Sequence, residues 1–169
     1  MSPHNPHVLK RCIELAREAL EAGDAPFGSV LVDPSGTILQ EDRNRTITGE
    51  KGDNKADGTL HPEFVLARWA QLNMSAEERA KATVYTSGEH CSMCSSAHAI
   101  VGLGPIVYIS STEQYGQWMK EAGIPAGPVA PLAINQVAPG IKVEGPIGGL
   151  DMQVKALHMR RWEKKCSGG

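Results

Sequence analysis

The sequence has no long hydrophobic run, few aromatic residues and almost no excess of charge of either sign. No apolar stretch approaches the ~18 residues of a membrane-spanning helix, so no membrane contact is expected. The first residues show no hydrophobic segment of the secretory type, from which a cytoplasmic location is expected. Aromatic residues make up 5% of the chain, and the formal net charge is −2. A charge this small excludes a large basic field for nucleic acid.

Cysteine is also scarce, with four residues in 169. Cys91 and Cys94 form a C-x-x-C pair, which in a chain without an export signal favours metal or redox chemistry over disulfides. Cys12 and Cys166 are expected to be ordinary thiols, because an isolated cysteine is usually a small buried hydrophobe. The hydrophobic fraction of 41% is ample for a packed core, and the length predicts a single domain over residues 1–169.

Two short stretches predict a catalytic zinc site: His61-Pro62-Glu63 and Cys91-Ser92-Met93-Cys94. Zinc binds cysteine sulfur and histidine nitrogen, and a catalytic site keeps one position open for water. Residues three apart share a helix face, so Cys91 and Cys94 can bind one ion, and a helix N-terminus favours the thiolate. Pro62 disfavours helical backbone at His61 but suits the first helical position. We therefore expect His61 just outside a helix and Glu63 in its first turn.

Other chemistries remain open for the same residues. His98 follows Cys94 by four positions, so a closed structural site of His61, Cys91, Cys94 and His98 is conceivable, but it leaves Glu63 without a role. A thioredoxin-like redox pair leaves both His61 and Glu63 unexplained. A cysteine–histidine nucleophile pair is compatible with composition alone. The catalytic zinc site uses every one of these groups except His98, and it is therefore preferred.

The spacing of H-x-E and C-x-x-C is the signature of zinc nucleobase deaminases. The sequence resembles the cytidine/deoxycytidylate deaminase superfamily, in the branch that holds bacterial guanine deaminases and tRNA adenosine deaminases. The resemblance covers most of residues 8–111 and includes Ala25-Pro26-Phe27-Gly28-Ser29-Val30, Asn44, His61–Glu63 and Thr86–Cys94. His90 stands where the family usually has a proline.

The resemblance implies a fold and a set of roles. The fold would be a three-layer α/β/α domain with a mixed five-stranded sheet. His61, Cys91 and Cys94 would bind Zn²⁺, and Glu63 would move protons during catalysis. The resemblance also implies a homodimer, with the C-terminal segment, about residues 112–169, completing a pocket or the dimer.

Substrate contacts are implied less directly. Asn44 would hydrogen-bond the base, and the backbone near Pro62 would help to orient it. Phe27 and Glu113 resemble residues of the guanine deaminase branch, in which an acidic side chain near Glu113 handles the substrate's amine and protons. His90 would either face the substrate or simply replace a proline at a turn.

Hydrophobic periodicity and turn residues predict the element order. A helix is expected to have a buried stripe of Val65, Leu66, Trp69 and Leu72. The segment Leu132–Val137 is expected to be an edge strand, followed by a loop over 139–149. The remaining expectations are helices at 8–22, 91–101, 114–122 and 154–164, strands at 27–32, 37–41, 83–86 and 106–109, and loops at 44–59 and 123–131.

Three functions compete. The first choice is hydrolytic deamination of a purine-type base, guanine above all, or of a related nucleoside. The second is deamination of adenosine in tRNA, favoured by a basic terminal helix containing Lys155, Arg160, Arg161, Lys164 and Lys165, which otherwise is a solvated helix face. The third is a non-catalytic, zinc-stabilised binding module, against which Glu63 argues because a structural site does not need it.

Overall fold

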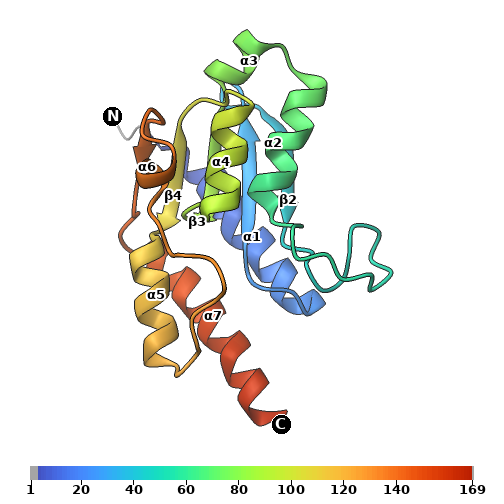
Figure 1. The fold of residues 1–169 in the computed structure, drawn as a ribbon, viewed down its shortest axis with the longest axis vertical. Coiled ribbons are helices and arrows are strands. Elements are labelled where there is room, and N and C mark those ends of the chain that lie inside the picture. Colours follow the sequence, from blue (N-terminus) through green and yellow to red (C-terminus); the bar gives the residue numbers. More distant parts are fainter. Residues whose placement is uncertain (1–3, 169) are drawn as a thin grey trace.

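The computed structural model describes residues 4–168, which form a mixed five-stranded sheet between two groups of helices (Figure 1). The strand order is β2-β1-β3-β4-β5. β1 (Gly28–Val32) pairs antiparallel with both β2 (Ile38–Arg43) and β3 (Thr83–Gly88). β4 (Ile106–Ser110) lies parallel to β3, and β5 (Val143–Glu144) lies parallel to β4. The structure confirms the predicted α/β/α fold, and its sheet begins with the expected hairpin, β1 followed by β2.

Different helices cover the two faces of the sheet. α1 (Pro6–Ala22) and α7 (Leu150–Ser167) pack on one face, with α5 (Thr112–Glu121) beside α7. α2 (Pro62–Asn73) covers the other face, with α4 (Ser92–Ile100) alongside it. The short helices α3 (Ala76–Lys81) and α6 (Ile134–Val137) contact α2 and α4, respectively.

The central strands are buried on both faces, which explains why they appear as continuous apolar runs in the sequence. Val30 and Val32 belong to the hydrophobic cluster formed with α1 and α7, whereas Leu31 between them belongs to the cluster formed with α2. Tyr85 and Val84 divide between the same two clusters. Side chains therefore alternate across the sheet and supply two cores, one under each helical layer.

One predicted strand is wrong. Leu132–Val137, expected to be an edge strand, ends in the single-turn helix α6, because the Gln136 side chain accepts a hydrogen bond from the Ala133 N–H at 2.8 Å and the Glu89 carboxylate accepts one from the Ile134 N–H at 2.8 Å. The real edge strand is β5, inside the segment expected to be a loop. It has only two residues, which is too short for a period-2 pattern to reveal.

The expected stripe of α2 is also partly wrong. Leu72 is 73% exposed, while Leu66, Ala67 and Ala70 form the buried face together with Pro62 and Glu63. The two alanines allow close packing against the neighbouring layer. The predicted buried face, chosen from the large apolar side chains, is therefore rotated relative to the observed one. Alanine is only weakly hydrophobic, so the periodicity of large apolar residues does not reveal its burial.

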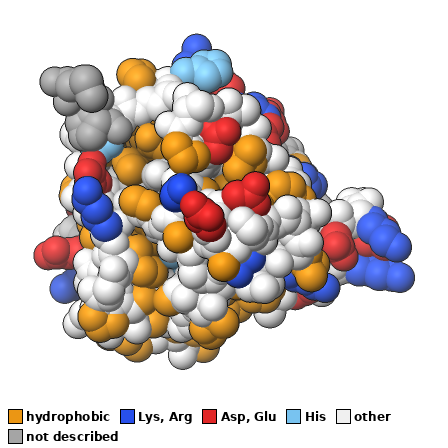
Figure 2. Space-filling model, turned by 90° about the horizontal axis from the view of Figure 1, so that it is seen from above, with side chains coloured by type: hydrophobic (Ala, Val, Ile, Leu, Met, Phe, Trp, Pro, Cys, Tyr) orange, Lys and Arg blue, Asp and Glu red, His pale blue; other side chains and the backbone are white. Residues whose placement is uncertain are grey.

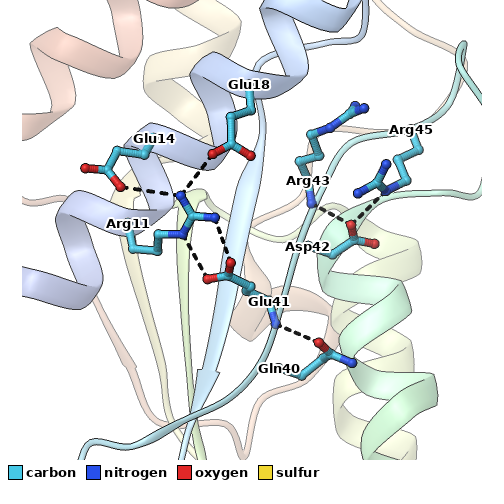
Figure 3. A network of polar contacts seen from close by, with 8 residues as sticks. All are labelled: Arg11, Glu14, Glu18, Gln40, Glu41, Asp42, Arg43 and Arg45. Atoms are coloured by element: carbon cyan, nitrogen blue, oxygen red, sulfur yellow. Dashed lines mark hydrogen bonds and ion pairs between the residues drawn. The ribbon is translucent and has the colours of Figure 1, made fainter. Parts of the chain in front are cut away.

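Polar side chains tie α1 to the hairpin (Figure 3). Arg11 binds Glu41 of β2 through two hydrogen bonds, Nε to Oε2 at 2.9 Å and Nη2 to Oε1 at 2.7 Å, and its Nη1 reaches Glu18 at 2.9 Å. This bidentate arrangement fixes direction as well as distance.

Within residues 4–168, no helix combines the length and hydrophobicity required to cross a bilayer.

The long segment between β2 and α2 has no regular structure, as predicted, and Asp24 anchors it. The Asp24 side chain is buried and accepts hydrogen bonds from the N–H groups of Ile47 (2.8 Å) and Thr48 (3.0 Å), from the Thr48 hydroxyl (2.6 Å) and from Arg43 Nη1 (2.8 Å). Burial alone raises the pKa of Asp24, but the hydrogen bonds from Thr48, Ile47 and Arg43 outweigh it and hold the pKa below the ordinary value.

Asp24→Asn is therefore expected to destabilise the fold by about 1–3 kcal/mol at neutral pH, the usual cost of leaving buried groups without a partner. A depressed carboxyl pKa contributes stability that is present above the ordinary value of ~3.9 and disappears as pH falls through the folded value. Urea unfolding should show the gap between variant and wild type narrowing below about pH 4.

Asp53→Asn is the matched control, because Asp53 lies in the same loop but is exposed. It should unfold like wild type. An unchanged urea midpoint for Asp24→Asn at pH 7 would show that the anchor contributes nothing.

Candidate active site and metal centre

The two motif stretches meet at the N-termini of neighbouring helices. His61 is the N-cap of α2, with extended backbone (φ −80°, ψ 138°), Pro62 opens the helix, and Glu63 lies in its first turn. Cys91 is the N-cap of α4, and Cys94 lies in the first turn of that helix. This is the local layout that the proline predicts. Because α2 and α4 pack side by side, both helix starts point to one place.

The donor atoms have the spacing of a zinc site. His61 Nδ1 lies 3.5 Å from Cys91 Sγ and 3.6 Å from Cys94 Sγ. The three donor atoms all lie within 4.8 Å of one another. A tetrahedral zinc with bonds of ~2.3 Å to sulfur and ~2.0–2.1 Å to nitrogen places those atoms about 3.6 Å apart. The side chains present therefore fit the ion, and three protein ligands leave the fourth position open.

His98 is not part of this group. Its Nε2 lies 2.7 Å from the Gly104 carbonyl oxygen, so the imidazole fastens the end of α4 to the following turn. Among residues 4–168, the grouping of donors that can hold a metal is His61, Cys91 and Cys94 without His98. The closed structural site considered from the sequence is thus not formed.

The electrostatics of the two thiols differ. A hydrogen bond from Cys94, opposed by burial and reinforced by His61, lowers the pKa of Cys91 to about 4. The pKa of Cys94 is raised, first because it donates to Cys91 and then because it is buried near Glu63. Zinc binds cysteines as thiolates, so metal binding at this pair releases thiol protons.

Glu63 is buried and held from one side. Its Oε1 accepts hydrogen bonds from the hydroxyls of Ser29 (3.1 Å) and Thr86 (2.9 Å), and its Oε2 lies 3.5 Å from Cys94 Sγ. Burial is the main cause that raises the pKa of Glu63 above its ordinary value. A carboxyl group with a raised proton affinity, fixed at the ligand cluster, suits the repeated proton transfers of a general acid/base.

Sequence reasoning assigned no role to Ser29 and Thr86. Both are polar residues inside apolar strands, and they are direct partners in the β1–β3 register. Thr86 also accepts a hydrogen bond from Ser29 at 2.9 Å. Hydroxyl side chains inside two apolar strands were the signal in the sequence that a buried polar group, here the Glu63 carboxylate, packs against them.

A cavity of about 840 Å³ opens over this cluster, and its lining includes His61, Glu63 and Cys91. The predicted contacts Phe27, Asn44 and Pro62 also line it. The Asn44 Oδ1 accepts from the Thr46 N–H (3.1 Å) and hydroxyl (2.9 Å), which leaves the Asn44 NH₂ as the donor available to a ligand. The far wall comes from α5, the following loop and α7 of the same chain.

Two predicted site residues lie elsewhere. Glu113 is exposed in the first turn of α5 and lines a separate, adjoining hollow rather than this cavity. His90 is fully buried against His98, with ring centroids 5.3 Å apart, and is not part of the cavity lining. The second carboxylate that does line the cavity is Glu89, which the sequence analysis did not single out.

A model of the cytidine and deoxycytidylate deaminase zinc-binding region matches residues 3–110, including all three donors and Glu63. The chain belongs to this family. It is accordingly a zinc-dependent deaminase, with His61, Cys91 and Cys94 as zinc ligands and Glu63 as the catalytic carboxylate.

Curated relatives in the family act on different bases. The chain is 28% identical over 127 residues to a probable cytosine deaminase of Schizosaccharomyces pombe (75% of this chain, 70% of that protein). It is 37% identical over 90 residues to the guanine deaminase of Bacillus subtilis (53% of each). It is 31% identical over 90 residues to the tRNA-specific adenosine deaminase of Haemophilus influenzae (53% of this chain, 49% of that protein). The last two alignments span only about half of each relative.

A solved structure supports the fold. The guanine deaminase of Nitrosomonas europaea superposes with a TM-score of 0.71, covering 94% of this chain and 85% of that one, at 20% identity. At this identity the likeness concerns the fold, and it extends over the C-terminal helices that the family model does not reach.

Purified protein is expected to contain about one zinc per chain, since three ligands and an open position define one site. Cys94→Ala should lose most of the metal and unfold at a lower temperature, because metal binding is coupled to folding. Elemental analysis and thermal unfolding measure the two effects.

Cys166→Ala and His98→Ala serve as controls, because Cys166 is exposed and His98 contacts a carbonyl instead of the site. Both should retain zinc. Full occupancy in Cys94→Ala, or metal loss in His98→Ala, would contradict the assignment.

Proposed function

We propose that the chain catalyses the hydrolytic deamination of a purine-type base, with the guanine ring as first choice, free or within a nucleoside. The observation that carries the proposal is the Glu63 carboxylate, which is buried beside the zinc ligands and lines a cavity large enough for a heterocycle. The higher identity to a guanine deaminase than to the other two relatives favours the guanine ring.

The chain's residues divide the reaction between them. Zinc, when bound by His61, Cys91 and Cys94, supplies the Lewis acidity that makes water a nucleophile near neutral pH. Glu63 Oε2 faces the ligand cluster and takes the water proton, while Ser29 and Thr86 hold Oε1 in place. Glu63 delivers this first proton to the ring nitrogen as the water oxygen adds to the amino-bearing carbon. It then takes the second proton from the added hydroxyl and delivers it to the amine, so that the C–N bond breaks and ammonia leaves.

Other groups orient the ring. The Asn44 NH₂ is free to donate to a ring acceptor, and Phe27 presents an aromatic wall to the cavity. Gly88 also lines the cavity, and a Cβ there would lie 3.1 Å from the Phe27 ring. Glycine at this position therefore allows the ring to pack closely against the strand. Glu113 and His90 have no part in this mechanism, because neither lines the cavity.

Glu63→Gln is expected to keep zinc and fold but lose deamination by at least the ~10²–10⁴-fold typical of a general acid/base, because the amide cannot accept the water proton. Ammonia release from guanine, together with zinc content, measures the separation of chemistry from metal binding.

Glu163→Gln makes the same carboxylate-to-amide change at an exposed position of α7 and should leave turnover unchanged. Near-normal turnover by zinc-loaded Glu63→Gln would remove Glu63 as the proton carrier. Loss of zinc in that variant would instead place the carboxylate among the ligands.

Deamination of adenosine in tRNA is the second candidate. The predicted basic cluster is smaller than expected, because Lys155 pairs with Glu121 at 3.0 Å and Arg161 lines the cavity. Arg160, Lys164 and Lys165 remain exposed on α7. On the face seen in Figure 2, acidic and basic side chains are interspersed rather than gathered by sign, which does not favour a nucleic-acid surface there.

A tRNA substrate predicts a steep loss of activity with salt, because each neutralised phosphate adds to the salt slope. Free bases carry no phosphate, so we expect their turnover to change little between about 50 and 200 mM salt. Activity confined to tRNA, lost at higher salt and in Arg160→Gln/Lys164→Gln/Lys165→Gln, would replace the first choice with the second.

A further inference from the structure

The cavity is larger than one ring system requires. Its volume of about 840 Å³ lies in the upper part of the ~300–1,000 Å³ range of drug-sized ligand pockets. A base bound at Glu63 and Asn44 fills one end of such a space. The other end is bounded by α5, the neutral loop over 124–132 and α7.

Besides the ligand His61, two carboxylates and two cations line the cavity: Glu63, Glu89, Lys120 and Arg161. Glu63 lies beside the ligand Cys94, and the Glu89 carboxylate accepts hydrogen bonds from the N–H groups of Thr112 and Ile134. Both cations come from the C-terminal wall, one from α5 and one from α7.

A series of contacts connects the strand that leads to the metal ligands with the part of α7 that carries Arg161. Gly88 lies against the Phe27 ring, and Phe27 meets Tyr115 edge-on with ring centroids 5.7 Å apart. Tyr115 in turn packs on Trp162, the neighbour of Arg161, at 5.8 Å. The Arg161 charge acts on the Tyr115 phenol, partly offsetting the rise in the pKa of Tyr115 that burial causes. Phe27 and Tyr115 therefore belong to a series of aromatic contacts that runs from Gly88 to the residue next to Arg161.

Neither cation is neutralised by the protein. Within residues 4–168, the side chains of Lys120 and Arg161 form no ion pair or hydrogen bond. Glu89 does not serve them, because its two oxygens accept the N–H groups of Thr112 (2.9 Å) and Ile134 (2.8 Å). A planar guanidinium without a partner, facing a cavity, matches the geometry of a phosphate.

We infer that Arg161 and Lys120 form a subsite for an anionic group attached to the deaminated ring, and that the preferred substrate is a nucleoside monophosphate. The ring would lie at Glu63 and Asn44, the sugar along Phe27 and Tyr115, and the phosphate between the two cations. This inference rests on the proposed function, because it takes the ring to be deaminated at the zinc end. A single nucleotide is the occupant that a cavity of this volume with one pair of cations fits.

Binding and turnover test the two proposals separately. Calorimetry on the zinc-loaded Glu63→Gln protein compares GMP, AMP and CMP with guanosine, adenosine and cytidine. Each nucleoside and its monophosphate share the same ring, so the ratio of their dissociation constants reports the contribution of the phosphate alone. For at least one ring, the monophosphate should bind about tenfold or more tightly than the nucleoside, the scale of one charge-assisted hydrogen bond. Adding Arg161→Gln and Lys120→Gln should bring that ratio close to one.

Arg160→Gln with Lys164→Gln is the matched control, because it removes two charges from exposed positions outside the cavity lining. It should keep the wild-type ratio. Arg161→Lys should keep part of the preference for the monophosphate, because the positive charge remains but the paired N–H donors of the guanidinium are lost. Since the Arg161 side chain has no hydrogen-bond or ion-pair partner among residues 4–168, its replacement should not lower the unfolding temperature.

Ammonia release by wild-type protein from guanine, guanosine, GMP and a tRNA anticodon stem-loop completes the test. Phosphate-dependent binding through Arg161 without release of ammonia from any guanine compound would overturn the proposed ring and leave the subsite standing. Release from guanine with equal binding of nucleoside and nucleotide would overturn the subsite alone. Failure of every nucleotide to bind, or turnover restricted to the stem-loop, would also overturn the mononucleotide proposal.

Discussion

One spatial constraint organises the molecule: three donor atoms on two helices must lie within 4.8 Å of one another. It is met because α2 and α4 start at the same edge of the sheet and pack side by side. α4 is rich in serine and alanine, so its neighbours can approach closely. The parallel crossover from β3 through α4 to β4 brings Cys91 and Cys94 to that edge, and Pro62 turns His61 and Glu63 towards them. The residues of the metal centre therefore lie at the N-termini of two helices, and the sheet fixes the positions of those helices.

Around this centre, some polar side chains are hydrogen-bonded within the protein and others are available to a ligand. Ser29 and Thr86 hold one oxygen of Glu63 and leave the other facing the ligands. Asp24 fastens the loop after β2, and with it Asn44 and Thr46 in the cavity wall. Lys120 and Arg161, also in the cavity lining, form no side-chain hydrogen bond or ion pair with the residues that the structure describes. The site thus combines satisfied polar groups, which give rigidity, with unsatisfied ones, which are available to a ligand.

The sequence predicted the parts of this arrangement that depend on local chemistry. The zinc ligands, the N-cap position of His61 and the buried sheet follow from residue type, proline geometry and hydrophobic runs. The missing parts depend on tertiary contacts. β5 is too short to carry a pattern, α2 buries alanines in preference to Leu72, and Glu113 lies on the exposed side of the first turn of α5. The roles of Ser29, Thr86 and Arg161 arise only when distant strands and helices meet.

X-ray absorption at the zinc edge of the purified protein tests the central claim most directly, because it counts the atoms around the ion. The account predicts two sulfurs at ~2.3 Å, one imidazole nitrogen at ~2.0–2.1 Å and one further light atom from water. It also predicts an unchanged sulfur and imidazole shell in Glu63→Gln and His98→Ala. A shell with two imidazoles that loses one in His98→Ala, or a shell with a carboxylate that disappears in Glu63→Gln, would contradict a three-ligand catalytic zinc with Glu63 as its proton carrier.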